Sequence, residues 1–138
     1  MGGFDALRVS GSALRAGRTR MDVIAENIAN VETTRTAEGG PYRRQQVVLR
    51  AEQIGEAAAS GRCSGVAVAA IQADDGPLMR VHNPGHPDAD AEGYVELPNV
   101  DLPTEMADMV LAARAYEANA AALRSGREMI QSALSILA

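Results

Sequence analysis

Residues 82–93 carry the side chains of this chain whose types and spacing most resemble a metal site. Asp88, Asp90 and Glu92, followed by Gly93, match the first half of an EF-hand calcium loop, where alternating carboxylates surround the ion. The second half does not match, because Asn99 stands where the loop needs a bidentate glutamate. We therefore do not expect this segment to bind calcium.

Two histidines in the same segment, His82 and His86, raise the alternative of a zinc site. Side chains four residues apart meet on one face only in a helix, and a helix is excluded here by Pro84, Gly85 and Pro87. The interpretation that we favour is a rigid, turn-rich loop whose Asp and Asn side chains bond to their own backbone. No metal and no cofactor is predicted for the chain.

Other catalytic arrangements are missing from the sequence. The single cysteine, Cys63, excludes an intramolecular disulfide and lies in a Gly/Ser-rich stretch, which favours a spectator thiol. The sequence contains no phosphate-binding glycine loop, hydrolase triad or dinucleotide fingerprint. No enzyme is predicted.

Charge is distributed unevenly along the 138 residues, whose net charge is −5. Residues 1–62 contain nine Arg and seven acidic residues, whereas residues 63–138 contain four Arg and eleven acidic residues. This balance disfavours nucleic-acid binding, which needs clustered positive charge. Two interpretations of the asymmetry stay open: a head-to-tail contact between unlike ends, or two differently solvated surfaces.

Long amphipathic helices are predicted on both sides of the middle segment. Residues 4–30 form the first, because an apolar position recurs every seven residues at Leu7, Leu14, Met21 and Ile28. The second begins just after Asp101, a good N-cap, and continues to about residue 137. Its heptad stripe comprises Met109, Tyr116, Leu123, Ile130 and Leu137, with Met106, Ala113, Ala120 and Leu134 in the companion position.

Residues 32–100 have the pattern of a small β insert. Residues 42–49 and 66–71 are predicted strands, and residues 78–81 are expected to pair with the second of these after a turn at residues 74–77. Residues 52–65 are predicted to be a loop or linker. The predicted fold is mainly α, with helical segments 1–31 and 101–138 packed as an antiparallel coiled-coil-like pair beside an irregular, β-hairpin middle segment.

Two asparagines lie at the edge of the heptad seams. Asn27 and Asn119 each precede a core position by one residue, so we expect either a hydrogen bond across the helix pair or an ordinary exposed polar residue. The stripes have gaps at Ser10, Gly17 and Arg127, where we expect other subunits to pack.

Insertion into a membrane is not predicted. No apolar run is long enough to span a bilayer. Four arginines interrupt the first thirty residues, so they do not form the apolar core of a signal peptide. If the protein leaves the cytoplasm, we expect it to use a different route.

Three blocks of sequence together resemble the bacterial flagellar rod and hook axial proteins. Residues 21–30 (MDVIAENIAN), with 32–36 and 39–44, resemble the N-terminal signature of that family. Residues 84–99 (PGHPDADAEGYVELPN) look like the hallmark of one of its members, and residues 105–123 are similar to the family's terminal helix. These blocks stand in order and cover well over half the chain.

The resemblance implies a structural subunit of the flagellar basal-body rod in the bacterial cell envelope. Members of the family pack their terminal helices into a tube that transmits torque to the hook and encloses the export channel. The implied partners are further copies of the chain, other rod subunits and the flagellar export apparatus, which exports its substrates without a cleaved signal. The alternatives are another axial subunit of this family or, less favoured, a metal-binding module built on residues 88–92.

Two groups of residues are predicted to be functional. The assembly interface combines the heptad positions with motif residues of both helices: Leu7, Leu14, Met21, Ile24, Asn27, Ile28, Asn30, Val31, Met106, Met109, Ala113, Tyr116, Asn119, Ala120, Leu123, Ile130, Leu134 and Leu137. The family-motif loop comprises Gly40, Tyr42, Pro84, Gly85, His86, Pro87, Asp88, Asp90, Glu92, Gly93 and Tyr94.

Overall fold

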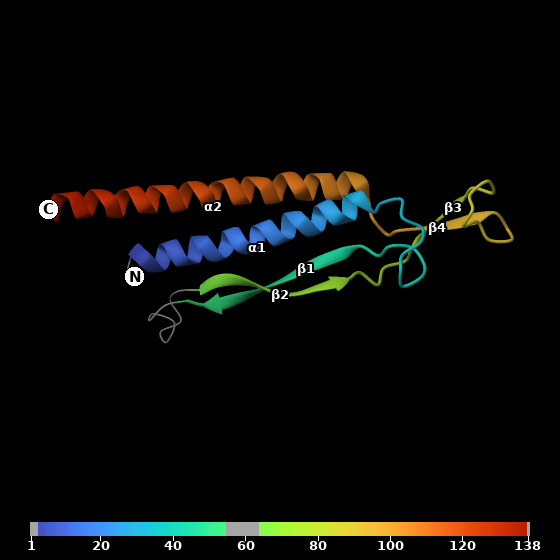
Figure 1. Ribbon diagram of the computed structural model, residues 1–138, viewed down its shortest axis with the longest axis horizontal. Helices are drawn as coiled ribbons and strands as arrows, with labels where there is room; N and C mark the ends of the chain where they lie inside the picture. Colours follow the sequence, from blue (N-terminus) through green and yellow to red (C-terminus); the bar gives the residue numbers. More distant parts are fainter. Residues whose placement is uncertain (1–2, 55–63, 138) are drawn as a thin grey trace.

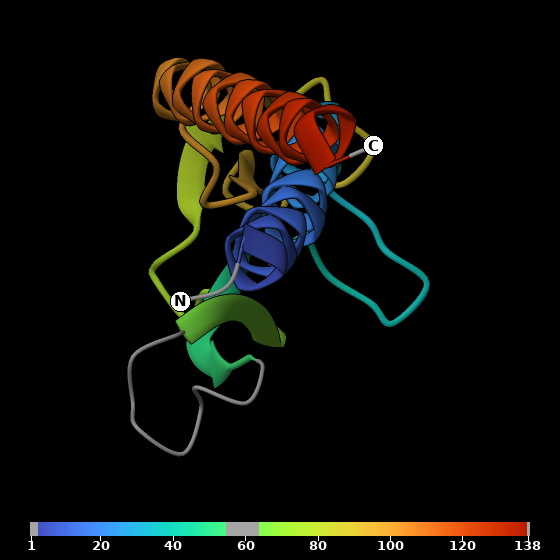
Figure 2. The same ribbon diagram turned by 90° about the vertical axis from the view of Figure 1, so that its left-hand side faces the viewer.

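The computed structural model describes residues 3–54 and 64–137 as an elongated molecule (Figure 1). Its elements, in chain order, are α1 (Gly3–Ala29), β1 (Gln45–Gln53), β2 (Ser64–Ala73), β3 (Met79–His82), β4 (Tyr94–Leu97) and α2 (Leu102–Leu137). α2, α1 and the β1–β2 hairpin lie side by side as three layers, with α1 in the middle (Figures 1 and 2). The predicted class, mainly α with a small β insert, is confirmed.

Both helices occupy the predicted segments. α2 begins one residue after Asp101, whose Oδ2 accepts a hydrogen bond from the backbone N–H of Thr104 at 3.2 Å, as an N-cap does. α1 ends at Ala29, and the side chain of Asn30 then donates to the carbonyl of Glu26 at 2.9 Å. Neither helix has a stretch that is long and apolar enough to cross a membrane.

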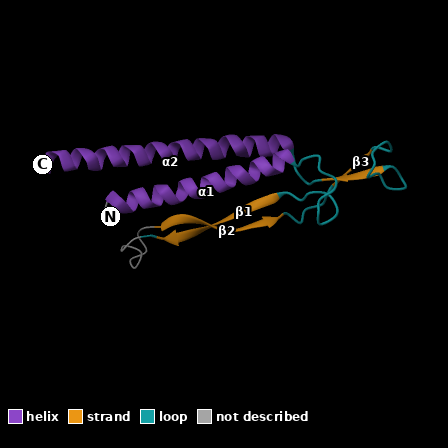
Figure 3. Cartoon of the chain, in the orientation of Figure 1, coloured by secondary structure: helices purple, strands orange, loops and turns teal. Residues whose placement is uncertain are grey.

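The two helices run side by side in opposite directions (Figure 3). Asn27 of α1 bonds to Glu105 of α2, and a Cβ on Gly17 would lie 3.7 Å from the ring of Tyr116. Gly17 therefore lies beside an aromatic side chain of the same chain, at a distance that a Cβ would tolerate. Our expectation that another subunit packs at Gly17 stays a prediction.

The seam of α2 that faces α1 differs from the predicted one by one residue. Its first stripe, Met109, Tyr116, Leu123 and Ile130, is half-buried as expected. The companion stripe is Glu105, Ala112, Asn119 and Gly126, whereas Met106 and Leu134 of the predicted companion stripe are 57% and 61% exposed. Small residues in this stripe let the helices approach closely, because a Cβ on Gly126 would lie only 2.8 Å from a methyl carbon of Leu7.

The strands pair differently from the prediction. β1 and β2 form one antiparallel hairpin, with Gln45 opposite Ala73 and Gln53 opposite Ser64, and the register shifts between Val48 and Leu49. β3 does not pair with β2, as predicted, but with β4 across the loop of residues 83–93. The predicted linker of residues 52–65 is strand at both ends, and Cys63 lies outside the described residues.

The turn at residues 74–77 redirects the chain and does not close a hairpin. Asp74 is tied to β1, because its backbone N–H donates to the carbonyl of Arg44 at 2.7 Å. Its carbonyl accepts a bond from the Asn99 side chain at 3.2 Å, just before α2. These distant contacts hold the end of β2 at the start of the helix pair, so the following strand finds its partner beyond the helices.

The β1–β2 hairpin packs against α1 through small side chains. The Ser12 hydroxyl is fully buried, donates to the carbonyl of Val9 at 2.7 Å and accepts from the backbone N–H of Val66 at 3.0 Å. A Cβ on Gly65 would lie 2.1 Å from Cδ1 of Ile54 and 2.5 Å from the Ser12 oxygen. Gly65 is therefore required for this close approach between strand and helix.

Candidate assembly site

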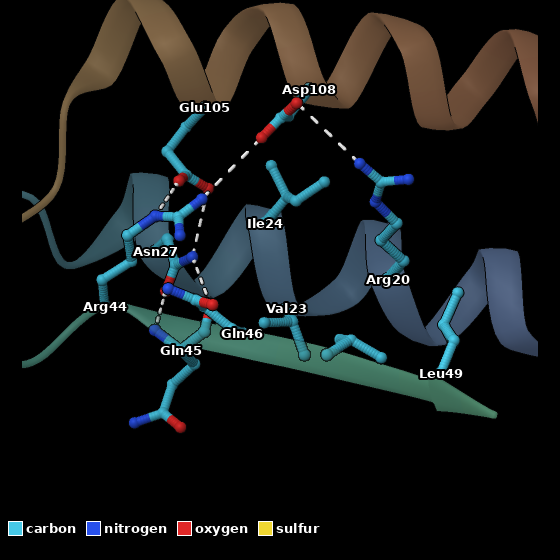
Figure 4. Close-up of a pocket in the computed structure, with 11 residues that line it drawn as sticks. Arg20, Val23, Ile24, Asn27, Arg44, Gln45, Gln46, Leu49, Glu105 and Asp108 are labelled. Atoms are coloured by element: carbon cyan, nitrogen blue, oxygen red, sulfur yellow. Dashed lines mark hydrogen bonds and ion pairs between the residues drawn. The ribbon is translucent and has the colours of Figure 1, made fainter. Parts of the chain in front are cut away.

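Asn27 is the centre of a buried polar junction between α1, α2 and β1 (Figure 4). Its Oδ1 accepts bonds from the Tyr42 hydroxyl at 2.9 Å and the backbone N–H of Gln45 at 2.8 Å. Its Nδ2 donates to the carbonyl of Gln45 at 3.0 Å and to Oε2 of Glu105 at 3.1 Å. The amide thus makes the four hydrogen bonds of which it is capable, which fixes its orientation.

Glu105 supplies a fully buried carboxylate to the same junction. Arg44 compensates its charge, with Nε donating to Oε1 of Glu105 at 2.6 Å. The guanidinium of Arg44 also lies 3.7 Å from a carboxylate oxygen of Asp108 and 3.9 Å from one of Asp74. A buried carboxylate is tolerated only with such charge-assisted bonds, so Arg44 and Glu105 stabilise the fold as a pair.

Tyr42 contributes a neutral hydrogen-bond donor. Burial raises the pKa of its phenol, and the negative charges of Glu26 and Glu105 raise that pKa further. The phenol therefore stays protonated and keeps donating to Asn27. Next to the junction, a pocket of about 210 Å³ is lined by side chains of α1, β1 and α2.

The carboxylates of the family-motif loop are bonded to protein groups. Asp88 accepts a hydrogen bond from the Thr34 hydroxyl at 2.7 Å and forms an ion pair with Arg35. The Thr34 bond is the largest contribution that lowers the pKa of Asp88, and the charge of Arg35 lowers it further. Among the described residues, no group of three or more His, Cys, Asp or Glu side chains is placed to hold a metal ion.

Asp90 closes the loop on itself. Its Oδ1 accepts from the backbone N–H groups of Glu92 at 2.9 Å and Tyr94 at 2.8 Å, and its Oδ2 accepts from Arg80 at 2.9 Å. The bond from the Tyr94 backbone is the largest cause of a lowered pKa at Asp90. Gly93 has a φ of 82°, and a Cβ there would lie 3.1 Å from the ring of His82. The loop is thus turn-rich, and Asp90 bonds to its own backbone as we predicted, whereas Asp88 bonds to Thr34 and Arg35.

The predicted interface residues divide into three groups by burial. Ile24 and Asn27 are buried. The largest group is half-buried: Leu7, Leu14, Met21, Ile28, Asn30, Val31, Met109, Ala113, Tyr116, Asn119, Ala120, Leu123 and Ile130. Met106 and Leu134 are exposed, and the side chain of Leu137 is not described. In the motif loop, Gly93 is buried, Tyr42, His86 and Asp88 are half-buried, and the exposed residues are Gly40, Pro84, Gly85, Pro87, Asp90, Glu92 and Tyr94.

The two asparagines have different roles. Asn27 forms the predicted bond across the helix pair. Asn119 donates to the carbonyl of Ala115 in its own helix at 2.9 Å, and of our two alternatives for Asn119 the described contacts do not include the bond across the helix pair. The sequence did not identify Glu105 and Arg44 as functional residues. A glutamate within a heptad pattern is normally interpreted as solvent-exposed, and Arg44, which bonds to Glu105, lies 61 residues away in the sequence.

The outer face of α2 carries a stripe of residues without charged side chains. The stripe runs along the helix next to the seam that contacts α1. It comprises Leu111, Ala115, Ala118, Ala122, Met129 and Ile136, all of which are exposed. The larger members are highly exposed: 63% for Leu111, 71% for Met129 and 84% for Ile136. Within each of the two rows, 111–118 and 115–122–129–136, the residues repeat at heptad spacing, as in a coiled-coil seam.

Known proteins share this chain's two helical segments. Residues 7–35 match the family model described as flagella basal body rod protein, and residues 91–136 match the one described as flagellar basal body rod FlgEFG protein C-terminal. The flagellar basal-body rod protein FlgC of Borreliella burgdorferi is 45% identical, and the match covers 99% of each chain. The chain belongs to the FlgC family. FlgC of Bacillus subtilis is 43% identical over 99% of each chain, and FlgC of Salmonella typhimurium is 39% identical over 93% of this chain and 92% of its own.

Membership in the FlgC family confirms the resemblance that the sequence motifs indicated. It gives the chain a place in the flagellar basal body, and the alternative of a metal-binding module is not favoured. The polar junction joins the two matched segments, because Asn27 lies in the first and Glu105 in the second. In this FlgC-family chain, Asn27 belongs to the sequence motif of the N-terminal helix, and its side chain also attaches that helix to the C-terminal helix.

Proposed function

We propose that this FlgC-family chain is a structural subunit of the flagellar basal-body rod that polymerises through α1 and α2. The observation that carries the proposal is the outer face of α2, which is apolar and exposed while the seam beside it is occupied by α1. Contiguous apolar surface of this kind is rare on monomeric proteins and marks an interaction site.

Two neighbouring seams on one helix suit a tubular assembly. In the proposed arrangement α1 and α2 pair as an antiparallel coiled coil, and the outer face of α2 contacts a helix of an adjacent subunit. Complete burial of Leu111, Met129 or Ile136 would contribute about 1.5–3 kcal/mol each. Alanines between them allow close packing of the helix backbones, so the contact needs no large side chains from the partner.

The proposal assigns different roles to the two parts of the chain. Segments 1–31 and 101–138 form the inner wall of the tube, which encloses the export channel, and residues 32–100 form an outer insert. Torque passes through the packed helices, which the junction of Asn27, Arg44 and Glu105 holds to the insert. The partners are further copies of the chain, other rod subunits and the export apparatus, and the role is mechanical and not catalytic.

A substitution on the outer face of α2 tests the proposal. This chain with Met129→Glu replaces the FlgC of a flagellated bacterium. Alternatively, the substitution is made in that bacterium's own FlgC, at the position that corresponds to Met129. We expect the variant to fold with unchanged helix content by circular dichroism, but rod incorporation and swimming should be lost. The matched control is Ser135→Glu, which adds the same charge at an exposed position off this face. Normal rods and normal swimming with Met129→Glu would overturn the proposal.

A further inference from the structure

The methionines of the chain differ widely in the exposure of their side chains. Among the described residues, Met129 is 71% exposed, Met106 57% and Met79 52%, whereas Met21 and Met109 are half-buried. Peroxides oxidise the thioether of methionine to a sulfoxide, and the access of the oxidant to the sulfur controls how fast this happens. Met129 is therefore the methionine in the described part of the chain that an oxidant reaches most easily.

Met129 is accessible because the residues one turn away from it on α2 are small. Neighbours on a helix surface lie three and four residues apart, and for Met129 they are Ser125, Gly126, Ser132 and Ala133. None of these side chains is long enough to cover a thioether. The exposure of Met129 thus follows from the sequence of α2 and lasts as long as the helix is intact.

Among the exposed methionines of the described residues, Met129 alone belongs to the outer face of α2. Met79 lies in β3, and Met106 lies near the start of α2, outside the stripe. The neighbours of Met129 in its heptad row are Ala122 and Ile136, which are apolar. Oxidation would add a strongly polar S–O group to this row. When the face is covered, the sulfoxide oxygen would exchange its hydrogen bonds to water for contact with apolar side chains, which costs free energy.

We propose that Met129 is a reversible oxidation site that controls the incorporation of the free subunit into the rod. In the free chain the side chain is open to solvent, and oxidation changes a flexible apolar group into a polar one on the contact surface. An oxidised copy should fold normally, because the added oxygen stays in water, but it should be excluded from the assembly. The inference rests on the proposed role of the outer face of α2 and adds a chemical condition under which that contact fails.

The oxidant that this step requires is a peroxide. A lone pair of the Met129 sulfur attacks one oxygen of hydrogen peroxide, and the S–O bond forms as the O–O bond breaks. The proton on the transferred oxygen passes to the departing hydroxide, which leaves as water. Sulfur loses the electron pair by which the peroxide is reduced. Reversal consumes a dithiol, which becomes a disulfide while the sulfoxide oxygen leaves as water, the reaction that methionine sulfoxide reductases carry out.

Peptide mass analysis of the full-length chain measures the order of oxidation. The chain is exposed to hydrogen peroxide at neutral pH, and the reaction is stopped with an excess of free methionine. We expect Met129 to be oxidised roughly fivefold or more faster than Met109, with unchanged helix content by circular dichroism. In urea the two rates should agree within about twofold, because unfolding removes the shielding of Met109. A rate for Met129 in the folded chain that does not exceed that of Met109 would overturn the inference.

Incorporation is measured in a flagellated bacterium that carries this chain in place of its own FlgC and lacks methionine sulfoxide reductase. After growth with sublethal hydrogen peroxide, the sulfoxide content at Met129 is compared between purified basal bodies and unincorporated chain. We expect it to be roughly tenfold or more lower in the basal bodies, because burying an unpaired polar atom weakens a contact by about that factor. Equal sulfoxide contents in the two pools would contradict the exclusion of oxidised copies.

Conservative variants separate Met129 from general damage by peroxide. Met129→Leu stays apolar and cannot form a sulfoxide, so peroxide should no longer reduce the number of rods. Met106→Leu makes the same exchange outside the outer face and should remain as sensitive to peroxide as the unchanged chain. Met129→Gln introduces a polar, uncharged side chain of similar length and should reduce the number of rods without peroxide.

The variants at Met129 also distinguish this inference from the proposed function. If Met129→Glu abolishes rods but Met129→Gln does not, or if Met129→Leu stays sensitive to peroxide, the oxidation site is overturned and the proposed contact stands. If Met129→Glu leaves rods intact, the contact is overturned together with the control that oxidation would exert on it.

Discussion

Asn27 of α1 and Glu105 of α2 are 78 residues apart in the sequence, and the Nδ2 of Asn27 donates to Oε2 of Glu105 across 3.1 Å. The same amide holds the start of β1 through both backbone groups of Gln45. One side chain thus attaches three elements to each other. Helix pairing and placement of the insert are consequently coupled at this point.

Replacing this amide by a carboxylate should uncouple the junction. Asn27→Asp removes the Nδ2 donor and places a second negative charge beside Glu105, so we expect the free energy of unfolding to fall by about 3 kcal/mol. Urea unfolding at neutral pH measures the change. Asn119→Asp is the matched control, because the described bond of Asn119 stays within its own helix, and it should cost less than about 1 kcal/mol. Equal losses from the two variants would contradict the central position of Asn27.

The Arg44–Glu105 pair should show strong coupling. Arg44→Met or Glu105→Leu alone leaves a buried group of the junction without its partner, and each should lower the free energy of unfolding by about 3–5 kcal/mol. The double variant should lose less than the sum of the single losses by about 2 kcal/mol. Additive losses in a double-mutant cycle would show that the two side chains act independently.

Gly65 should resist substitution by the smallest side chain. Gly65→Ala places a Cβ 2.1 Å from Ile54 and 2.5 Å from Ser12, so the hairpin must move away from α1. We expect a loss of about 1–3 kcal/mol in the free energy of unfolding. Gly11→Ala in α1 is the control, since its Cβ would meet nothing within 4 Å, and it should raise stability by up to about 1 kcal/mol. Thermal unfolding of both variants distinguishes steric crowding from a general effect of glycine.

Acid should weaken the motif loop. The pKa of Asp88 lies below the usual value of about 4 for Asp, chiefly because the Thr34 hydroxyl bonds to its carboxylate. A lowered pKa in the folded state means that this contribution to stability is complete above the unfolded pKa and is lost as the pH falls through the folded one. NMR titration of the Asp88 carboxyl should show a higher pKa in Thr34→Val. An unchanged pKa in that variant would show that the hydroxyl does not control the titration.

The helices were predictable because their signal is local. The bounds of α2 follow from the cap at Asp101 and from apolar periodicity, both of which act between residues a few positions apart. The sequence did not predict which face of α2 contacts α1 to better than one residue position. Apolar residues favoured Met106 for the seam, but Glu105 occupies it, because Arg44 and Asn27 bond to its carboxylate.

The middle segment shows the same limit in its strand pairing. Residues 78–81 were correctly predicted as a strand, yet the sequence contained nothing that distinguished β2 from β4 as its partner. The choice depends on Asp74, which is tied to Arg44 and Asn99 and turns the chain away from β2. Turn residues predicted that the chain would turn, whereas contacts with distant residues determined its direction.

Spacing along the chain was therefore enough to establish two long helices, a small β insert, a turn-rich acidic loop and a resemblance to flagellar rod proteins. Apolar periodicity, helix caps and turn chemistry depend on residues that are close together in the sequence, so the sequence alone predicts them. Folding decided which side of α2 meets α1 and that Glu105 is buried. Those features depend on contacts between residues such as Arg44 and Glu105, 61 positions apart, for which sequence spacing carries no information.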